Sequence, residues 1–71
     1  MNWDQVEGNW KQFKGKVRER WGRLTDDRLE QIKGRRDQLA GRIQEAYGFS
    51  KDEVEAQIRD FEQRYPDGHR H

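Results

Sequence analysis

Few side chains in this chain could act as a nucleophile, a general base or a metal ligand. It contains one serine, one threonine and two histidines, and it has no cysteine. Ser50 and Thr25 each precede acidic residues at an expected helix start, where a hydroxyl serves as the N-cap. His69 and His71 lie at the end of the chain, so no nucleophile–base pair can be drawn. These residues predict a protein without catalytic activity.

The acidic pairs are better explained by helix electrostatics than by metal binding or acid–base chemistry. Asp26-Asp27 and Asp52-Glu53 follow the two hydroxyl residues, and carboxylates are favourable in the first turn of a helix. His69-Arg70-His71 could hold a metal only weakly, and a chain without cysteine forms no thiolate zinc site. We therefore expect no metal and no cofactor.

A cluster of basic residues raises nucleic-acid binding as an alternative function. Its members are Lys14, Lys16, Arg18, Arg20, Arg35, Arg36 and Arg42. Helical hairpins with such faces can bind phosphate backbones. The pI is only about 8.1, however, and acidic residues such as Glu19 and Asp37 interrupt the basic faces. Nucleic-acid binding by this basic patch therefore remains the alternative function.

The elements that carry these residues are predicted to be helices. Val6, Trp10, Phe13, Val17 and Trp21 advance by three or four residues, which is the apolar stripe of an amphipathic helix. This pattern predicts a helix over residues 4–21, ended by Gly22 in a left-handed conformation. No alternation typical of strands occurs. We expect an all-α fold.

Three further helices are expected after residue 21. A short helix starts at Thr25, and its junction with the third helix, around residues 33–37, is either a kink or a break. The third helix ends at Gly48. Ser50 opens the fourth, which Pro66 stops. The short turns at 22–25 and 48–50 indicate two αα-hairpins.

The chain is long enough for one small domain. We expect a helical domain over residues 1–65 and a flexible tail over residues 66–71. The predicted core has Trp3 and Val6 at its edge and contains Trp10, Phe13, Val17, Trp21, Leu24, Leu29, Ile32, Leu39, Ile43, Tyr47, Phe49, Val54, Ile58 and Phe61.

Six glycines reveal an internal repeat. They form two triplets, Gly8, Gly15, Gly22 and Gly34, Gly41, Gly48. Within each triplet the glycines are seven residues apart, and the second triplet lies 26 residues after the first. Between residues 6–22 and residues 32–48, Gln12/Gln38 and Glu19/Glu45 are identical, and Val6/Ile32, Phe13/Leu39, Lys16/Arg42, Val17/Ile43 and Trp21/Tyr47 match in kind. Duplication of a structural unit is therefore the first interpretation.

A helical wheel places four of these glycines opposite the apolar stripes, on solvent-facing helix surfaces. Together with Lys11 they form a candidate surface for binding a partner, called the candidate partner face, which consists of Gly8, Lys11, Gly15, Gly34 and Gly41. Three interpretations stay open. In the first, the glycines arose by sequence drift that the fold tolerates. In the second, they keep the helices weak so that the protein becomes ordered on drying or binding. In the third, they form a smooth docking face for a partner.

Composition and hydropathy bear on location. Only 30% of residues are hydrophobic and 41% are charged, with a net charge of +1. No apolar run approaches the roughly 20 residues of a membrane-spanning helix, and no signal peptide is visible. The first helix resembles an interfacial helix, but its apolar stripe is explained more simply by the core. We expect a cytoplasmic protein.

The residues also resemble a known family. Residues 8–17 read Gly-Asn-Trp-Lys-Gln-Phe-Lys-Gly-Lys-Val, residues 21–27 read Trp-Gly-Arg-Leu-Thr-Asp-Asp, and the pattern continues over residues 32–48. This is similar to the CsbD-like family of small bacterial stress-response proteins. The resemblance implies a four-helix, SAM-domain-like arrangement of two crossed hairpins, and induction under general, osmotic or stationary-phase stress. It implies no catalytic residue.

These expectations together favour a non-enzymatic stress-response protein of the hydrophilin type. Such a protein would protect other macromolecules through its charged surface and its marginal stability. Its partners are not identified by the sequence beyond weak, non-specific contacts with other proteins.

Overall fold

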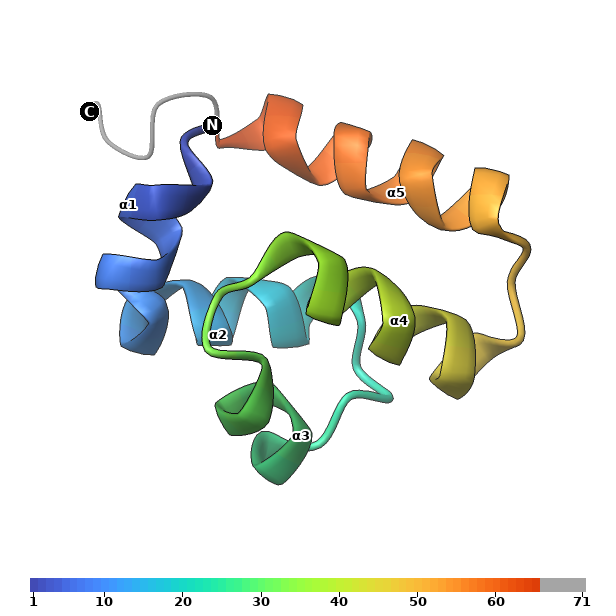
Figure 1. Ribbon diagram of the computed structural model, residues 1–71, viewed down its shortest axis with the longest axis horizontal. Coiled ribbons are helices and arrows are strands. Elements are labelled where there is room, and N and C mark those ends of the chain that lie inside the picture. Colours follow the sequence, from blue (N-terminus) through green and yellow to red (C-terminus); the bar gives the residue numbers. More distant parts are fainter. Residues whose placement is uncertain (66–71) are drawn as a thin grey trace.

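The computed structural model describes residues 1–65, and the expected tail of residues 66–71 lies outside the described part. Five helices follow one another: α1 (Trp3–Gly8), α2 (Trp10–Arg20), α3 (Asp26–Ile32), α4 (Arg36–Tyr47) and α5 (Lys51–Arg64). No strand occurs among these residues, which confirms the all-α class. Figure 1 shows α5 above α4, α3 at the bottom, and α1 at one end.

The helix expected over residues 4–21 is divided at Asn9, so the prediction of four helices is wrong by one. Asn9 leaves the helical region, with φ −120° and ψ 32°. Its N–H donates back to the carbonyls of Gln5 and Val6, and its side-chain amide also donates to Gln5. Its own carbonyl accepts from the N–H groups of Gln12 and Phe13. An asparagine that bonds backbone groups in this way competes with helix continuation, and Gly8 beside it is a weak helix former.

The uncertain junction between the second and third predicted helices is a true break. Lys33 caps α3 in the left-handed region at φ 54°, and Gly34 follows at φ 80°. The chain then turns into α4 at Arg36. The prediction that Gly34 lies mid-helix on a solvent face is therefore wrong. It is buried, and a Cβ there would lie 2.8 Å from the Cα of Glu7.

The expected helix starts are confirmed at both hydroxyl residues. The Thr25 hydroxyl accepts from the N–H of Arg28 at 3.3 Å, and the Ser50 hydroxyl accepts from the N–H of Glu53 at 3.1 Å. Gly48 ends α4 in the left-handed region as expected, at φ 71°. Gly22 does not adopt this conformation, since α2 is capped by Trp21 at φ −127°.

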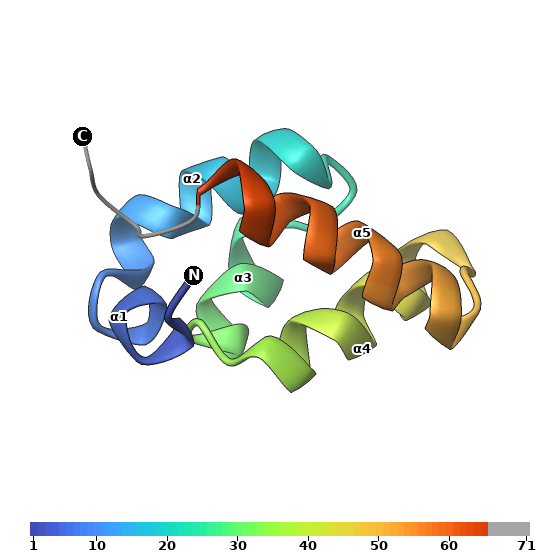
Figure 2. The ribbon, with the colours of Figure 1, turned by 90° about the horizontal axis from the view of Figure 1, so that it is seen from above.

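The internal repeat corresponds to a pair of helices, one short and one long. Helix α2 begins at residue 10 and α4 at residue 36, which is the spacing of the repeat. Each long helix follows a short one, and each is followed by a short link to another helix. Figure 2 shows the two long copies, α2 and α4, on opposite sides of α5. Helix α5 thus covers both copies.

The core is formed by one row of apolar side chains from each helix. The buried residues are Val6, Trp10, Phe13, Val17, Trp21, Leu24, Leu29, Ile32, Leu39, Ile43, Val54, Ile58 and Phe61. Val6 is fully buried and not at the edge as predicted, whereas Tyr47 and Phe49 are only partly buried. These two rings stack on each other at the end of α4, with centroids 5.2 Å apart.

Each tryptophan also donates a hydrogen bond to another element. The indole N–H of Trp10 donates to the carbonyl of Leu29 at 2.8 Å, within the core. That of Trp21 donates to Gln57, and that of Trp3 donates to Glu62, both on α5. A buried indole N–H without a partner would be costly, so these bonds fix how α1, α2 and α3 sit on their neighbours.

Candidate functional site

The residues best suited to catalysis are engaged in structure. The hydroxyls of Thr25 and Ser50 cap α3 and α5. Among residues 1–65, no group of three or more histidine, cysteine, aspartate or glutamate side chains could hold a metal ion. His69 and His71, which the sequence analysis considered as metal ligands but did not predict to form a metal site, lie outside the described residues. The hydroxyl residues of the described part are thus engaged in helix capping.

The candidate partner face is only partly brought together. Gly8, Gly15 and Gly41 are exposed, and a Cβ at any of them would meet no atom within 4 Å. Lys11 is exposed one turn before Gly15 on α2, whereas Gly41 lies on α4. Because α5 lies between these two helices (Figure 2), Lys11 and Gly15 are separated from Gly41. Gly34 is buried.

The basic residues of α2 are largely neutralised by acidic neighbours. Lys14 lies 3.4 Å from a carboxylate oxygen of Glu30, and Arg18 lies 3.5 Å from one of Asp26. Arg20 approaches Asp60 at 3.9 Å. Lys16 lies over the ring of Tyr65, 4.9 Å from its centroid. These contacts dock α2 onto α3 and α5.

The basic residues around α4 form ion pairs as well. Arg36 binds two carboxylates on α5, Glu55 at 2.9 Å and Glu62 at 3.0 Å. Arg42 binds Glu45 at 3.1 Å, and Arg35 is exposed at the N-cap of α4. The predicted patch is thus spread over two helices on opposite sides of α5, and five of its seven members lie within ion-pair distance of carboxylates.

Arg36 is the centre of a polar cluster that includes Glu55, Glu62 and Trp3. Its hydrogen bonds to Glu55 raise the pKa of Arg36 and lower the pKa of Glu55. Partial burial acts to raise the pKa of Glu62, but hydrogen bonds from Trp3 and Arg36 outweigh it and the pKa of Glu62 is lowered. The cluster therefore holds both carboxylates ionised, and it joins α1, α4 and α5. Neither glutamate was singled out from the sequence, because their distance from Arg36 along the chain gives no local signal.

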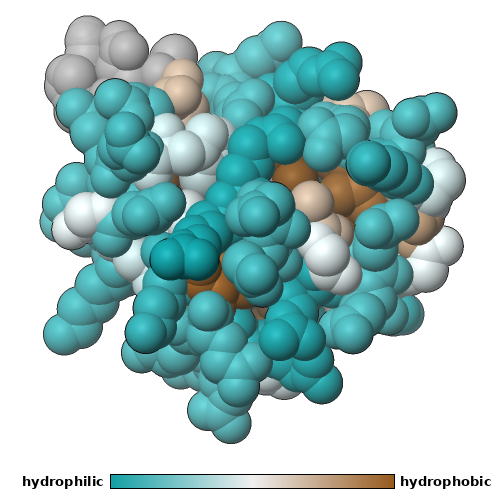
Figure 3. Space-filling model, in the orientation of Figure 1, coloured by the Kyte–Doolittle hydropathy of each residue, from teal (hydrophilic) through white to brown (hydrophobic). Residues whose placement is uncertain are grey.

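The rest of the described surface is hydrophilic. None of the large hydrophobic side chains in residues 1–65 is exposed, and none of the polar or charged residues there is buried. Figure 3 shows this as a mostly teal surface, with hydrophobic colour visible in recesses between helices. One open groove of about 650 Å³ borders α1, α4 and α5, where Gly41 and Ala40 line it together with Trp3 and Val54.

The apolar face of α2 contributes to the core. Trp10, Phe13 and Val17 are 8%, 5% and 0% exposed, so this helix presents no apolar face for membrane insertion in the folded state. None of the described helices combines the length and apolar character that crossing a bilayer requires.

Comparisons with known proteins agree with the sequence pattern described above. The model of the CsbD-like family matches residues 4–56. The UPF0337 protein RPA4217 of Rhodopseudomonas palustris is 61% identical over 61 residues, which span 86% of this chain and 92% of the relative. The UPF0337 protein YjbJ of Escherichia coli K12 is 59% identical over 64 residues, 90% of this chain and 93% of the relative. The UPF0337 protein RB0906 of Rhizobium meliloti is 69% identical over 61 residues, 86% and 88% respectively. The chain belongs to the CsbD-like family, which is associated with the general stress response.

Proposed function

We propose that this protein is a non-enzymatic, cytoplasmic protein that protects other macromolecules during osmotic, stationary-phase or desiccation stress, in the manner of a hydrophilin. Its family supports the stress context. Its surface supports the mode of action, because the described part combines dense charge with no exposed large hydrophobic residue. Such a surface can lie between neighbouring proteins without binding any of them tightly.

The observation that carries the proposal is the open space around Gly15 and Gly41. Each stands at the middle of a long helix, and a Cβ at either position would touch nothing within 4 Å. Neither glycine is required by a turn or by close packing, yet each costs about 1 kcal/mol relative to alanine. A domain of this size has a stability of about 4–10 kcal/mol, so the two positions remove a substantial part of it.

Weak helices with balanced charges suit a protein that must remain hydrated and adaptable. The exposed ion pairs contribute little to stability, at most about 1 kcal/mol each, but they keep the surface hydrated and the net charge near zero. When water is lost, helices of this kind can tighten or rearrange around other molecules. We expect the contacts with protected proteins to be weak and non-specific.

The test is the double substitution Gly15→Ala with Gly41→Ala. Adding two methyl groups in open space should stabilise the fold by about 2 kcal/mol and raise Tm by about 8–16 °C. A dehydrogenase dried and rehydrated with this variant should recover less activity than one dried with the wild type. Equal recovery with the stabilised variant would refute the role of weak helices.

A matched control uses the glutamines at equivalent positions of the two repeats. Gln12 and Gln38 are both exposed on α2 and α4, and alanine there removes a side chain without filling a glycine position. The pair Gln12→Ala with Gln38→Ala should change Tm by only a few degrees and leave protection unchanged. A loss of protection in this control would show that any change of these surfaces matters.

A further inference from the structure

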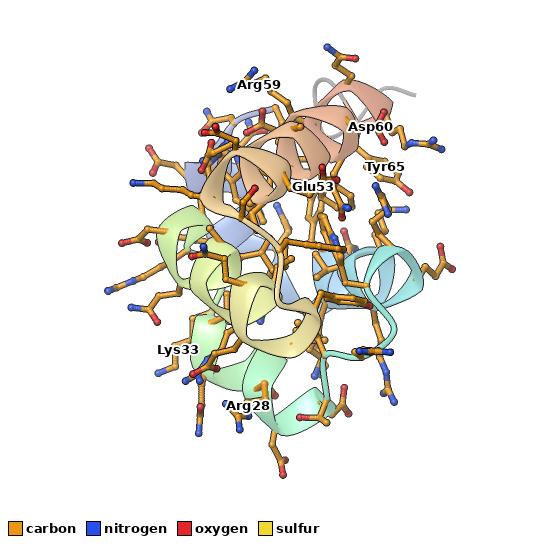
Figure 4. All side chains as sticks on the ribbon, turned by 90° about the vertical axis from the view of Figure 1, so that its right-hand side faces the viewer. Arg28, Lys33, Glu53, Arg59, Asp60 and Tyr65 are labelled. Atoms are coloured by element: carbon orange, nitrogen blue, oxygen red, sulfur yellow. The ribbon has the colours of Figure 1, made fainter. Side chains whose placement is uncertain are left out.

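A cleft between α3 and the C-terminal half of α4 gathers three arginines. It has a volume of about 550 Å³ and includes Arg23, Arg28, Arg42, Glu45, Leu24 and Ala46 in its lining. The three arginines face one glutamate, so the lining carries an excess of positive charge. Leu24 and Ala46 add apolar surface to the lining. Figure 4 shows Arg28 on α3, at the side where α4 passes.

Two of the three arginines, Arg42 and Arg23, are held in place by contacts that do not involve Glu45. Arg42 is only 28% exposed at its side chain, and it donates to Gln31 on α3 at 3.2 Å. Arg23 lies over the Tyr47 ring, 5.3 Å from its centroid, and donates to the carbonyl of Ala46 at 3.4 Å. The backbone N–H of Arg23 donates to the Tyr47 hydroxyl at 3.1 Å. A binding group positioned in advance loses little entropy when a ligand arrives.

Glu45 occupies the cleft as an internal counter-ion. A single oxygen, Oε1, accepts from Arg42 at 3.1 Å and from Arg28 at 3.3 Å. The glutamate side chain is 65% exposed, so this bond is weak and easily exchanged for another anion. One carboxylate cannot satisfy three guanidinium groups, each of which has five donors.

This imbalance is larger in the cleft than at the other ion pairs of residues 1–65, where at most two arginines, Arg20 and Arg64, share one carboxylate, that of Asp60. Lys14 lies near two carboxylates, those of Asp26 and Glu30, and Arg36 binds those of Glu55 and Glu62. Arg36 alone has two carboxylates, and Lys14 and Arg18 together have two, whereas in the cleft three arginines face one carboxylate. Guanidinium groups match phosphate oxygens with paired, charge-assisted hydrogen bonds.

We propose that this cleft binds a pyrophosphate group, either as the free anion or as part of a nucleotide. The phosphate oxygens displace the Glu45 carboxylate and accept from Arg28 and Arg42, with Arg23 at the rim. The site is independent of the protective role proposed above, because it depends on three particular side chains and not on the weakness of the helices.

The experiment is a titration of the ¹⁵N-labelled protein with sodium pyrophosphate, and separately with ATP, at low ionic strength where screening is weak. We expect backbone shifts that centre on the cleft. Arg28→Gln and Arg42→Gln should each weaken binding by about tenfold, because each removes charge-assisted bonds. Glu45→Gln should strengthen binding several-fold, because it removes the internal competitor. ATP binding no tighter than pyrophosphate would identify the phosphate chain alone as the ligand, and tighter binding would identify a nucleotide.

Arg64→Gln is the matched control. Arg64 is also an exposed arginine paired with a carboxylate, Asp60 at 3.2 Å, but it lies at the far end of α5. It should leave the pyrophosphate affinity unchanged. No shifts at low salt would overturn the proposal, and so would equal weakening by Arg64→Gln or no gain from Glu45→Gln. Circular dichroism of each variant checks that the helices are intact.

Discussion

Replacing Gly34 by alanine should destabilise the fold strongly, although Gly8, Gly15 and Gly41 have open space for a side chain. Gly34 has φ 80°, a region that alanine enters only with strain. Its missing Cβ also faces the backbone of α1. An ideal Cβ would lie 2.8 Å from the Cα and 3.1 Å from the nitrogen of Glu7. These atoms belong to a helix backbone and cannot rotate away as a flexible side chain would.

The two effects can be estimated separately. The left-handed conformation costs alanine about 1–2 kcal/mol, and forcing the α1 backbone to move costs about 1–3 kcal/mol more. The expected loss is therefore about 2–5 kcal/mol. Against a total stability of about 4–10 kcal/mol, this would leave a fold that melts at much lower temperature or is partly unfolded at 25 °C.

The substitution Gly48→Ala measures the cost of the left-handed backbone conformation without a steric contact of the new Cβ. Gly48 has a similar φ of 71°, but a Cβ there would meet nothing within 4 Å. Urea unfolding followed by tryptophan fluorescence should show a loss of about 1–2 kcal/mol for Gly48→Ala and a larger loss for Gly34→Ala. If the two variants lose the same stability, the proposed contact between Gly34 and α1 does not constrain the fold.

Three further predictions follow from the ion pairs and the core. The free energy of unfolding should fall as the pH drops below 4.5, the ordinary glutamate pKa, because the pKa values of Glu55 and Glu62 are lowered in the folded state and their stabilisation is lost as they protonate. Arg36→Gln should flatten this dependence in urea melts between pH 3 and 6, and an unchanged slope would contradict the cluster's role. Trp10→Phe should cost about 1–3 kcal/mol in thermal melts, because it removes the buried bond to Leu29 and leaves unfilled volume. Duplex DNA should show no binding in fluorescence anisotropy at physiological salt, and binding that falls steeply with salt would restore the nucleic-acid alternative.

Features that depend on local sequence were predictable. The core predicted from the sequence contains twelve of the thirteen buried residues, and Val6 was placed only at its edge. The hydroxyl caps at Thr25 and Ser50 were predictable because an N-cap needs only residues within one turn. The neutralisation of the basic patch was not predictable. Its ion pairs join residues of different helices, such as Arg36 and Glu62, and their distance depends on how the helices pack.

The break at Asn9 shows where a periodic pattern misleads. Val6 and Trp10 are four residues apart, which fits one continuous helix, and both are indeed buried. A short helix that turns at Asn9 buries them equally well, because α1 then packs across the end of the molecule (Figure 1). Periodicity records which side chains face the core, and it does not record whether the backbone between them is continuous. The asparagine after a glycine was the local signal for the turn.

Gly8 and Gly34 occupy equivalent positions of the repeat but have opposite environments, and the reason lies in how the two copies meet. Each copy has a link between its short and its long helix, at Asn9 in the first and at Gly34 in the second. The end of α1 packs against the second link, so that the backbone of Glu7 lies where a side chain on Gly34 would be. Gly8 faces open space beside that same contact. A duplicated sequence specifies the same local structure twice. Where the two copies touch, however, the backbone of one copy covers the link of the other, so only one of the two equivalent glycines is buried. The burial of Gly34 is therefore a property of the assembled pair, and no helical wheel drawn on one copy could show it.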